Sequence, residues 1–515
     1  MTYTLGINAA FHDSAACLVH NGEIVAASEE ERFTRIKHGK RPIPFSTYKL
    51  PFHAIDFCLR AGGIVLADVD DVAYSFDPWQ LLSDEYRDRV TIGLPLEPSA
   101  HPTDWDSPWE PLFLSSIVNA PRHLASGAPH HIAARFAGVT PNGPFRWHWV
   151  DHHLAHAASA FLVSPFDEAA VMTLDGRGER LTTGYYAGCG TSLRPLAGVS
   201  YPHSLGLLYE AVTAYLGFLH SSDEYKVMAL ASFGRPAYRD ELRSLITLDP
   251  PDYTIAALDL ESRFGPPRRR GEPLEQRHYD LARSLQDVLE EVVLELAGWL
   301  HDKTGLDNLC LAGGVALNCV LNARLRDFGP FRSVWVQPAA GDAGTALGAA
   351  VWIDSRMHDR RPPPMNHVYL GPAYDEDEIE SFLHWSKLPY RRLTDIPRET
   401  AELLAGGRIV GWFQGQMEFG PRALGARSIL ASPCDPDMQA RLNEIKDRED
   451  FRPVAPAVLA EDAGGWFRDA GESPFMLFVH DIWPDKADRI PAVRHVDGTA
   501  RIQTVTREQN PLYHD

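Results

Sequence analysis

The first apolar runs of the chain are short and are separated by polar turns, a pattern that predicts strands rather than helices. They cover residues 4–8, 15–19 and 24–27, and Asn21-Gly22 lies between the last two runs. Asn-Gly favours a type I′ turn because both turn positions need positive φ. The pattern therefore predicts one strand followed by a β-hairpin.

The same pattern recurs further along the chain. Residues 170–174 predict a strand, residues 175–178 (Asp-Gly-Arg-Gly) a polar turn, and residues 181–187 an answering strand. Two such units in one chain predict an internal duplication. In a nucleotide-binding fold these turns would present backbone N–H groups to phosphates; the alternative is a pair of ordinary hairpins.

The middle of the chain combines helical and strand patterns. Apolar residues at helical spacing predict a long core-facing helix over Tyr279 to Leu300, with Gly305 as its stop. A strand at 309–311, a turn at Gly313-Gly314 with a second helix start, and a strand at 334–336 follow. This order predicts an α/β fold.

A run of two arginines and three prolines, residues 360–364, is the clearest boundary, because successive prolines cannot sit inside a helix or a central strand. We expect a first domain over 1–360, a proline-rich linker over 361–367 and a second domain over 368–515. In the second domain, residues 401–405 predict a helix and residues 409–413 a strand.

Composition narrows the class of protein. The 515 residues carry 49 Lys+Arg against 69 Asp+Glu, a formal charge of -20. This balance disfavours nucleic acid as the main ligand. The six cysteines form no Cys-x-x-Cys pair, so a disulfide framework or a cysteine zinc site is not expected. No run of about 18 apolar residues and no signal peptide is visible, so we expect a soluble, cytoplasmic protein of about two to four domains, without a membrane partner.

Cations gather locally in this acidic chain. The stretch 420–452 holds six of them: Arg422, Arg427, Arg441, Lys446, Arg448 and Arg452. A solvated helical face would explain such a run. The Gly-Pro-Arg sequence at 420–422, beside apolar neighbours, favours instead a shaped loop that binds an anion.

Four residues form a candidate metal site. His152 and His156 are spaced i, i+4, on one face of a predicted helix, where two imidazoles can share a metal. Asp175 and Asp342 follow predicted strands, and the carboxyl ends of strands face the ligand crevice of α/β folds. The alternatives are a structural histidine pair and two aspartates that cap a turn or a helix.

The segment 313–318 (Gly-Gly-Val-Ala-Leu-Asn) opens a helix after a strand, which allows close approach of a nucleotide to the backbone at Gly313 and Gly314. It is not a Walker loop, because no Gly-Lys-Ser/Thr sequence follows.

These motifs, in this order and over nearly the whole chain, resemble the O-carbamoyltransferases of antibiotic tailoring and nodulation-factor synthesis, such as the tobramycin carbamoyltransferase type. The resemblance rests on the segments 11–16, 30–35, 152–158, 175–176, 224–228, 313–318, 341–344, 415–427 and 446–453.

The resemblance implies a two-domain α/β architecture. The N-terminal domain would be of the actin-like ATPase (ASKHA) class, similar to the threonylcarbamoyl transferase that acts on tRNA, and the C-terminal domain would be YrdC-like. In the family, the YrdC-like domain makes carbamoyl adenylate from carbamoyl phosphate and ATP with Mg²⁺. The first domain then transfers the carbamoyl group to a hydroxyl of a small molecule.

The resemblance also assigns residues. The metal ligands would be His152, His156, Asp175 and Asp342, with Fe²⁺ or another divalent ion that holds the adenylate phosphate. Carbamoyl phosphate and the ATP phosphates would meet Lys446, Arg448 and Arg452, with Arg422 and Arg501 as further candidates.

Two residues are assigned near the acceptor and the nucleotide. His12 matches a histidine at the acceptor site, where it would take the hydroxyl proton or stabilise the oxyanion; a histidine that caps a turn is the alternative. Lys37 resembles a lysine that contacts the nucleotide, alongside Gly313, Gly314 and Asn318; an exposed surface lysine is the alternative.

Other readings stay open at this point. A threonylcarbamoyl transferase acting on tRNA and a catalytically silent nucleotide-binding regulator are the competing functions, and a homodimer is an open option. Residues 74–145, rich in proline with Trp79, Trp105 and Trp109, match the family least, so they are either an acceptor-specific insertion or a surface excursion. The family continues past the segment 510–513 into an Asn-Thr-Ser-Phe-Asn motif. We therefore expect a YrdC-like domain truncated at Asp515, without one further phosphate-contacting arginine.

Overall fold

The two predicted strand-and-hairpin units each begin a five-stranded sheet, and the two sheets have the same topology. In the computed structural model, which describes residues 2–10, 12–39, 50–81, 114, 116–126 and 143–515, the first sheet has the order β3-β2-β1-β4-β5 and the second β8-β7-β6-β11-β12. In both, three strands are antiparallel neighbours and two further strands join in parallel. The predicted duplication is confirmed.

The strand bounds agree closely with the sequence pattern. The first sheet consists of β1 (Tyr3–Asn8), β2 (Ala15–His20), β3 (Glu23–Glu29), β4 (Asp71–Tyr74) and β5 (Arg146–Trp149). The second consists of β6 (Glu168–Leu174), β7 (Leu181–Cys189), β8 (Ser192–Ser200), β11 (Asn308–Ala312) and β12 (Ser333–Val336). At the predicted type I′ turn, Asn21 has φ 50° and Gly22 φ 81°, so both positions adopt the expected positive φ.

Two helices pack between the sheets and form one buried cluster with both of them: α5 (His152–Phe161) and α12 (Ala343–His358). Glycine permits their close contact, because a Cβ at Gly348 would lie 1.9 Å from the carbonyl oxygen of Ala155. The N-termini of these two helices carry three of the four predicted metal ligands.

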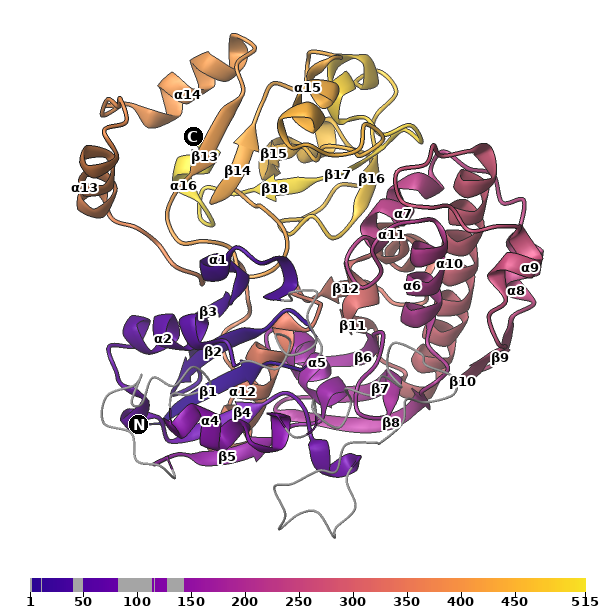
Figure 1. The fold of residues 1–515 in the computed structure, drawn as a ribbon, viewed down its shortest axis with the longest axis horizontal. Coiled ribbons are helices and arrows are strands. Elements are labelled where there is room, and N and C mark those ends of the chain that lie inside the picture. The colour runs from indigo at the N-terminus through magenta and orange to yellow at the C-terminus, as the bar shows by residue number, and fades with distance from the viewer. Residues whose placement is uncertain (1, 11, 40–49, 82–113, 115, 127–142) are drawn as a thin grey trace.

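The remaining helices of this part cover the outer faces of the sheets (Figure 1). The first sheet carries α1 (Glu31–Thr34), α2 (Phe52–Ala61) and α4 (Ala120–Ser126). The second carries α6 (Leu205–Tyr215), α7 (Glu224–Ala231), α8 (Arg239–Arg243), α9 (Leu260–Phe264), α10 (Gln276–Thr304) and α11 (Cys319–Phe328), with the hairpin β9 (Ile246–Asp249) and β10 (Asp252–Ile255). The long predicted helix is confirmed as α10, and Gly305 ends it with φ 65°.

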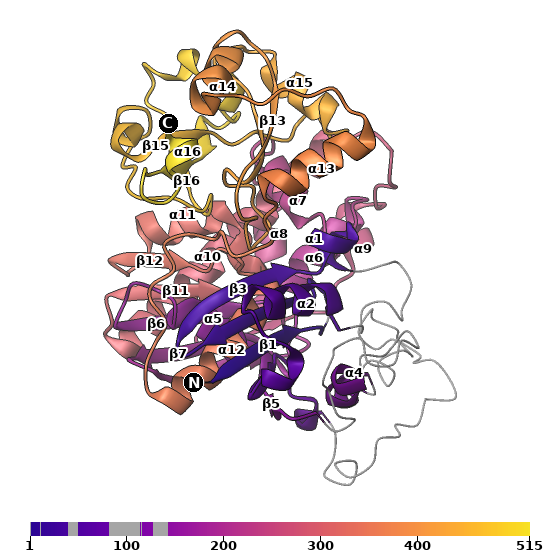
Figure 2. The same ribbon diagram turned by 90° about the vertical axis from the view of Figure 1, so that its left-hand side faces the viewer.

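The C-terminal residues gather at one end of the molecule, above both sheets in Figures 1 and 2. Their strands form pairs: β13 (Val410–Phe413) with β14 (Arg427–Leu430), β15 (Ala457–Leu459) with β18 (Gln503–Val505), and β16 (Val479–Asp481) with β17 (Thr499–Arg501). The helices are α13 (Glu376–Ser386), α14 (Ile396–Ala405), α15 (Met438–Ile445) and α16 (Pro511–His514). The mixed α/β class is confirmed, while the YrdC-like assignment of this part stays a prediction.

The predicted helix over 401–405 is too short. α14 begins at Ile396, because the Asp395 side chain accepts the Arg398 N–H and Pro397 occupies the first turn.

The proline-rich segment is held against the N-terminal part. After α12 ends at His358, residues 360–368 form neither helix nor strand. The Arg361 guanidinium donates to the backbone carbonyls of Phe161, Leu162 and Ser164. The domain boundaries themselves stay a prediction.

Two further findings concern the chain as a whole. The six cysteines are free thiols. Within the described ranges, no helix is both long enough and apolar enough to cross a membrane. Most of the sequence segment 74–145 lies outside the described residues, and the prediction of an acceptor-specific insertion there stays untested.

Candidate active site

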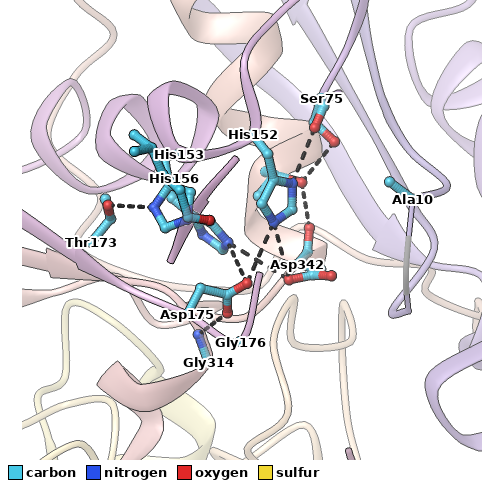
Figure 3. A network of polar contacts seen from close by, with 12 residues as sticks. Ala10, Ser75, His152, His153, His156, Thr173, Asp175, Gly176, Gly314 and Asp342 are labelled. Atoms are coloured by element: carbon cyan, nitrogen blue, oxygen red, sulfur yellow. Dashed lines mark hydrogen bonds and ion pairs between the residues drawn. The ribbon is translucent and has the colours of Figure 1, made fainter. Parts of the chain in front are cut away.

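The N-terminal half of α5 positions two imidazoles on one face. Asp151 caps the helix by accepting the Leu154 N–H at 2.8 Å, which fixes where the helix begins. His152 and His156 are one turn apart, and their ring centroids lie 4.7 Å from each other. Both side chains are fully buried and point toward the same two carboxylates (Figure 3).

The carboxylates come from the second sheet and from α12. Asp175 follows β6, and Asp342 directly precedes α12. The Nε2 atom of His152 lies 3.6 Å from a carboxylate oxygen of each aspartate, and that of His156 lies 4.0 Å from Asp175 and 3.6 Å from Asp342. Four ligand atoms, one from each residue, all lie within 4.8 Å of one another. The structure brings together all four predicted metal ligands.

Hydrogen bonds orient two of these ligands. The Nδ1 of His152 lies 3.1 Å from the carbonyl oxygen of Ser75, so a proton on Nδ1 leaves the Nε2 lone pair toward the carboxylates. Asp175 accepts the Gly314 N–H at 2.7 Å through one oxygen and turns its other oxygen toward the histidines (Figure 3).

The charged groups of the cluster are buried, and the pKa values of His152 and Asp342 depend on their neighbours. Burial disfavours the His152 cation, but the carboxylates of Asp342 and Asp175 hold the His152 pKa well above its usual value. Burial likewise opposes ionisation of Asp342, and His12 and His152 nevertheless hold the pKa of that carboxyl well below normal. A proton on His152 therefore offsets part of the negative charge of the two carboxylates.

The residues fit a divalent metal ion. Both ring nitrogens of His156 and both carboxylate oxygens of Asp342 are buried and make no hydrogen bond in the structure. Buried polar atoms of this kind usually have partners. Two imidazoles and two carboxylates are a donor set that suits iron or zinc.

The intervening histidine has a different role. His153 turns away from the cluster (Figure 3), with Nδ1 2.7 Å from the Thr173 hydroxyl and Nε2 2.9 Å from the carbonyl oxygen of Leu181. Both of its nitrogens are engaged in holding α5 against the second sheet.

A cavity of about 400 Å³, the metal-side cavity, opens beside the four predicted metal ligands. Asp175 and Asp342 form part of its wall. Of the residues predicted to meet acceptor and nucleotide, His12, Lys37, Gly314 and Asn318 line it. Gly313 does not belong to the lining. Its role is backbone geometry, because it has φ 96° and a Cβ there would lie 2.1 Å from the Leu174 carbonyl oxygen.

His12 lies between the metal cluster and a second acidic group. Its Nδ1 is 3.0 Å from Asp13 and 3.8 Å from Asp342, and its side chain is 23% exposed. Asp13 also contacts His38 Nδ1 at 2.7 Å. Burial opposes ionisation of Asp13, yet His12 and His38 lower the pKa of its carboxyl. His12 therefore has access to the cavity and a carboxylate that orients its ring.

Lys37 and Asn318 have local partners in the structure. The Lys37 ammonium donates to the Ser222 hydroxyl at 2.8 Å, and Asn318 caps α11 by accepting the N–H groups of Val320 and Leu321. A contact of either side chain with a nucleotide stays a prediction.

A second cavity, the cationic cavity, has a volume of about 560 Å³ and lies in the C-terminal part. All five predicted phosphate-binding cations line it: Arg422, Lys446, Arg448, Arg452 and Arg501. The other two arginines of the cationic stretch have structural partners instead. Arg427 pairs with the buried Glu418 at 2.8 Å, and Arg441 with Asp435 at 3.3 Å.

The cavity cations repel one another. Burial lowers the pKa of Arg422 to about 9 and that of Arg448 to about 10, and Arg501 adds to both shifts. Partial burial lowers the pKa of Lys446 as well, and Arg448, Arg452 and Arg501 lower it further. The Nε atoms of Arg422 and Arg501 are buried and make no hydrogen bond. An anion would relieve both the repulsion and the missing bonds.

The two cavities share part of their walls. Pro421, Arg422 and Arg452 line both of them, whereas Lys446, Arg448 and Arg501 line only the larger one of the two. The cationic cavity and the metal-side cavity are thus neighbours across the contact between the two parts of the chain.

Several residues of the site were missed in the sequence. Glu179 accepts the His152 N–H at the start of α5, and Asp13 and His38 flank His12. Glu224 lines the metal-side cavity, and burial raises its pKa to about 7. Asp13 and Glu224 belong to segments that carry the resemblance, whereas no local signal marks Glu179 or His38.

Two family models match most of the chain. A family described as Carbamoyltransferase N-terminus matches residues 3–90 and 146–351, and one described as Carbamoyltransferase C-terminus matches residues 401–515. The chain belongs to the carbamoyltransferase family. It is accordingly a transferase.

Relatives cover almost the whole chain. The nodulation protein NolNO of Sinorhizobium fredii is 39% identical over 98% of this chain and 71% of its own length. The protein sll1178 of Synechocystis is 42% identical over 100% of this chain and 88% of its own length. Among solved structures, an activator of 2-hydroxyisocaproyl-CoA dehydratase from Clostridium difficile is 11% identical and covers 70% of this chain and 96% of its own, with a TM-score of 0.37.

Proposed function

We propose that this carbamoyltransferase makes carbamoyl adenylate from carbamoyl phosphate and ATP and transfers the carbamoyl group to a hydroxyl of a small natural product. The observation that carries the proposal is the adjacency of two cavities that share Arg422 and Arg452. One is lined by cations, and the other borders a His₂Asp₂ cluster.

The cationic cavity suits the first half-reaction. Carbamoyl phosphate and the ATP triphosphate are both anionic, and Arg forks with one Lys bind such oxygens and neutralise developing charge. Lys446, Arg448 and Arg501 line this cavity and not the one beside the His₂Asp₂ cluster, so we assign them to carbamoyl phosphate and pyrophosphate. The step consumes one water: carbamoyl phosphate is hydrolysed to carbamate and phosphate. A carbamate oxygen then attacks the α-phosphorus of ATP, which forms carbamoyl adenylate and releases pyrophosphate.

The metal-side cavity suits the second half-reaction. His152, His156, Asp175 and Asp342 would hold a divalent ion, Fe²⁺ in our proposal, which supplies charge stabilisation at the adenylate phosphate. His12 faces the same cavity, and its imidazole accepts the proton of the acceptor hydroxyl while the new carbon–oxygen bond forms and AMP leaves. Asp13 orients the ring for this step.

The fold supports this division of labour. Two sheets of identical order with helices between them agree with an actin-like ATPase architecture, in which turns and helix starts at the strand ends meet a nucleotide. The Gly313–Asn318 segment, which follows β11, borders the metal-side cavity through Gly314 and Asn318.

Incubation with ATP, Mg²⁺, carbamoyl phosphate and a panel of hydroxylated natural products tests the proposal. We expect a product heavier by one carbamoyl group, with AMP and pyrophosphate formed in equal amounts. Parallel incubation with threonine, bicarbonate and tRNA separates the competing function. Modified tRNA without any carbamoylated small molecule would contradict the proposal.

A further inference from the structure

Arg422 and Arg452 occupy the junction of the two cavities, yet both come from the C-terminal part of the chain. N-terminal residues contact Arg452 directly and fix the backbone next to Arg422.

The contact at Arg452 is an aromatic ring. The Arg452 guanidinium lies 4.6 Å from the ring centroid of Tyr225 on α7, and the Lys37 ammonium lies 5.1 Å from the same centroid. A cation over a tyrosine ring is attracted by the ring quadrupole. Beside this ring, Lys226 bridges the two parts of the chain through a 2.6 Å bond to Glu449, the residue three positions before Arg452.

The contact at Arg422 acts through the backbone two residues before it. The Arg32 guanidinium donates to the Gly420 carbonyl oxygen at 2.7 Å, and Glu29 accepts the Gly420 N–H at 2.8 Å. Arg32 and Glu29 also pair with each other at 2.8 Å, and both are buried. Both polar groups of Gly420 are thus fixed from the N-terminal part, and Arg422 then reaches the Leu317 carbonyl oxygen at 3.2 Å.

Both contacts lie in sequence segments to which the proposed function assigns no role, residues 29–35 and 224–228. We propose that Tyr225 and the Glu29–Arg32 pair are positioning residues that hold Arg452 and Arg422 at the junction of the two cavities. This inference rests on the proposed function, because it assigns the two arginines to phosphate groups of the nucleotide.

The Tyr225 contact is tested with a matched pair of variants. Tyr225→Leu removes the ring, whereas Tyr225→Phe keeps the ring face and removes only the hydroxyl, which lies 3.4 Å from Asp223. We expect Tyr225→Leu to raise the Kd of ATP, measured by titration calorimetry on the full chain, by about 2- to 30-fold. Tyr225→Phe should stay within about twofold of wild type.

A double-mutant cycle separates positioning from general destabilisation. If Tyr225 acts through Arg452, Tyr225→Leu should add less than about twofold in the Arg452→Ala background, since the group that it positions is already gone. Arg32→Lys should likewise add less than about twofold in the Arg422→Ala background. A lysine ammonium cannot donate to Glu29 and to the Gly420 carbonyl oxygen with the geometry of a guanidinium. Arg146→Lys, at an ion pair with Asp71 at the edge of the first sheet, is the control and should leave the Kd unchanged.

Three results would overturn the inference: a wild-type Kd in Tyr225→Leu, an equal loss in Tyr225→Phe, or full additivity with Arg452→Ala. The Tyr225 pair decides the matter even where Arg32→Lys does not fold. Failure of the proposed function looks different, because a wild-type protein that binds ATP but forms no carbamoyl adenylate leaves these Kd comparisons valid.

Discussion

At the scale of single residues, the sharpest contrast is between two histidines of one helix. His156 faces the carboxylates and its ring nitrogens make no hydrogen bond, whereas both ring nitrogens of His153 are engaged by Thr173 and Leu181. We predict that His156→Ala weakens metal binding by more than about tenfold, because the loss of one imidazole removes a ligand. His153→Gln should lower the melting temperature and keep the metal. Metal analysis of both purified variants checks this, and full metal content in His156→Ala would refute the ligand assignment.

We expect His12 to act in the transfer step and not in adenylation. Its side chain contacts Asp13 and borders the metal-side cavity, whereas Lys446 and Arg448 line the other cavity. His12→Asn should slow transfer from supplied carbamoyl adenylate by about 100- to 10,000-fold, the usual range for a lost acid/base group. Adenylate formation should persist. Single-turnover transfer at the wild-type rate would return His12 to a role in the turn.

Lys446 predicts how carbamoyl phosphate binding depends on pH. Its pKa is lowered by partial burial and by three neighbouring arginines, so the ammonium loses its proton earlier than an ordinary lysine as the pH rises. The affinity for carbamoyl phosphate should therefore fall as the pH rises through that lowered pKa. Lys446→Arg should keep the affinity to higher pH, because a guanidinium holds its proton more tightly than an ammonium in the same surroundings. Identical pH profiles in the two proteins, measured by calorimetry, would contradict this role.

At the scale of elements, the sequence predicts most where one local signal decides the structure. The Asn21-Gly22 turn and the helix ended by Gly305 follow from backbone conformation and periodicity, and both are observed. The start of α14 was missed, because a cap at Asp395 and a proline in the first turn extend the helix beyond its apolar pattern. The supports of the site were also missed, since Ser75, His38 and Glu179 act through contacts between distant segments.

Glu179 is a buried residue that supports the start of α5. Its carboxyl accepts the backbone N–H groups of Asp77 and His152, which fixes the start of α5. Glu179→Ala removes the acceptor of both N–H groups, at about 1–3 kcal/mol of folding free energy. We predict this loss together with weaker metal binding. Glu179→Gln, which retains an acceptor oxygen, should lose less of both. Equal stability of the alanine variant and wild type in chemical denaturation would exclude the role.

At the scale of the whole molecule, the sequence shows a cation-rich stretch but does not show which of its cations line the same cavity. Arg501 is far from Arg422 in sequence and lines the same cavity, and Arg427, inside the stretch, pairs with Glu418 instead. The resemblance supplied Arg501, which no local pattern marks. Arg422 and Arg452 line both cavities because the two parts of the chain pack against each other. Neither a motif nor the hydrophobic periodicity encodes that packing.

In our proposal, adenylation and transfer occur in two adjoining cavities that share Arg422 and Arg452, while Lys446 lines only one of the two and His12 only the other. Exchange of labelled pyrophosphate into ATP, without any acceptor, reports adenylation alone. Our account predicts exchange that requires carbamoyl phosphate, persists at close to the wild-type rate in His12→Asn, and falls by about 30-fold or more in Lys446→Met, which loses a cation at the phosphates. Exchange that is absent from the wild-type protein, or that falls equally in His12→Asn and Lys446→Met, would contradict it.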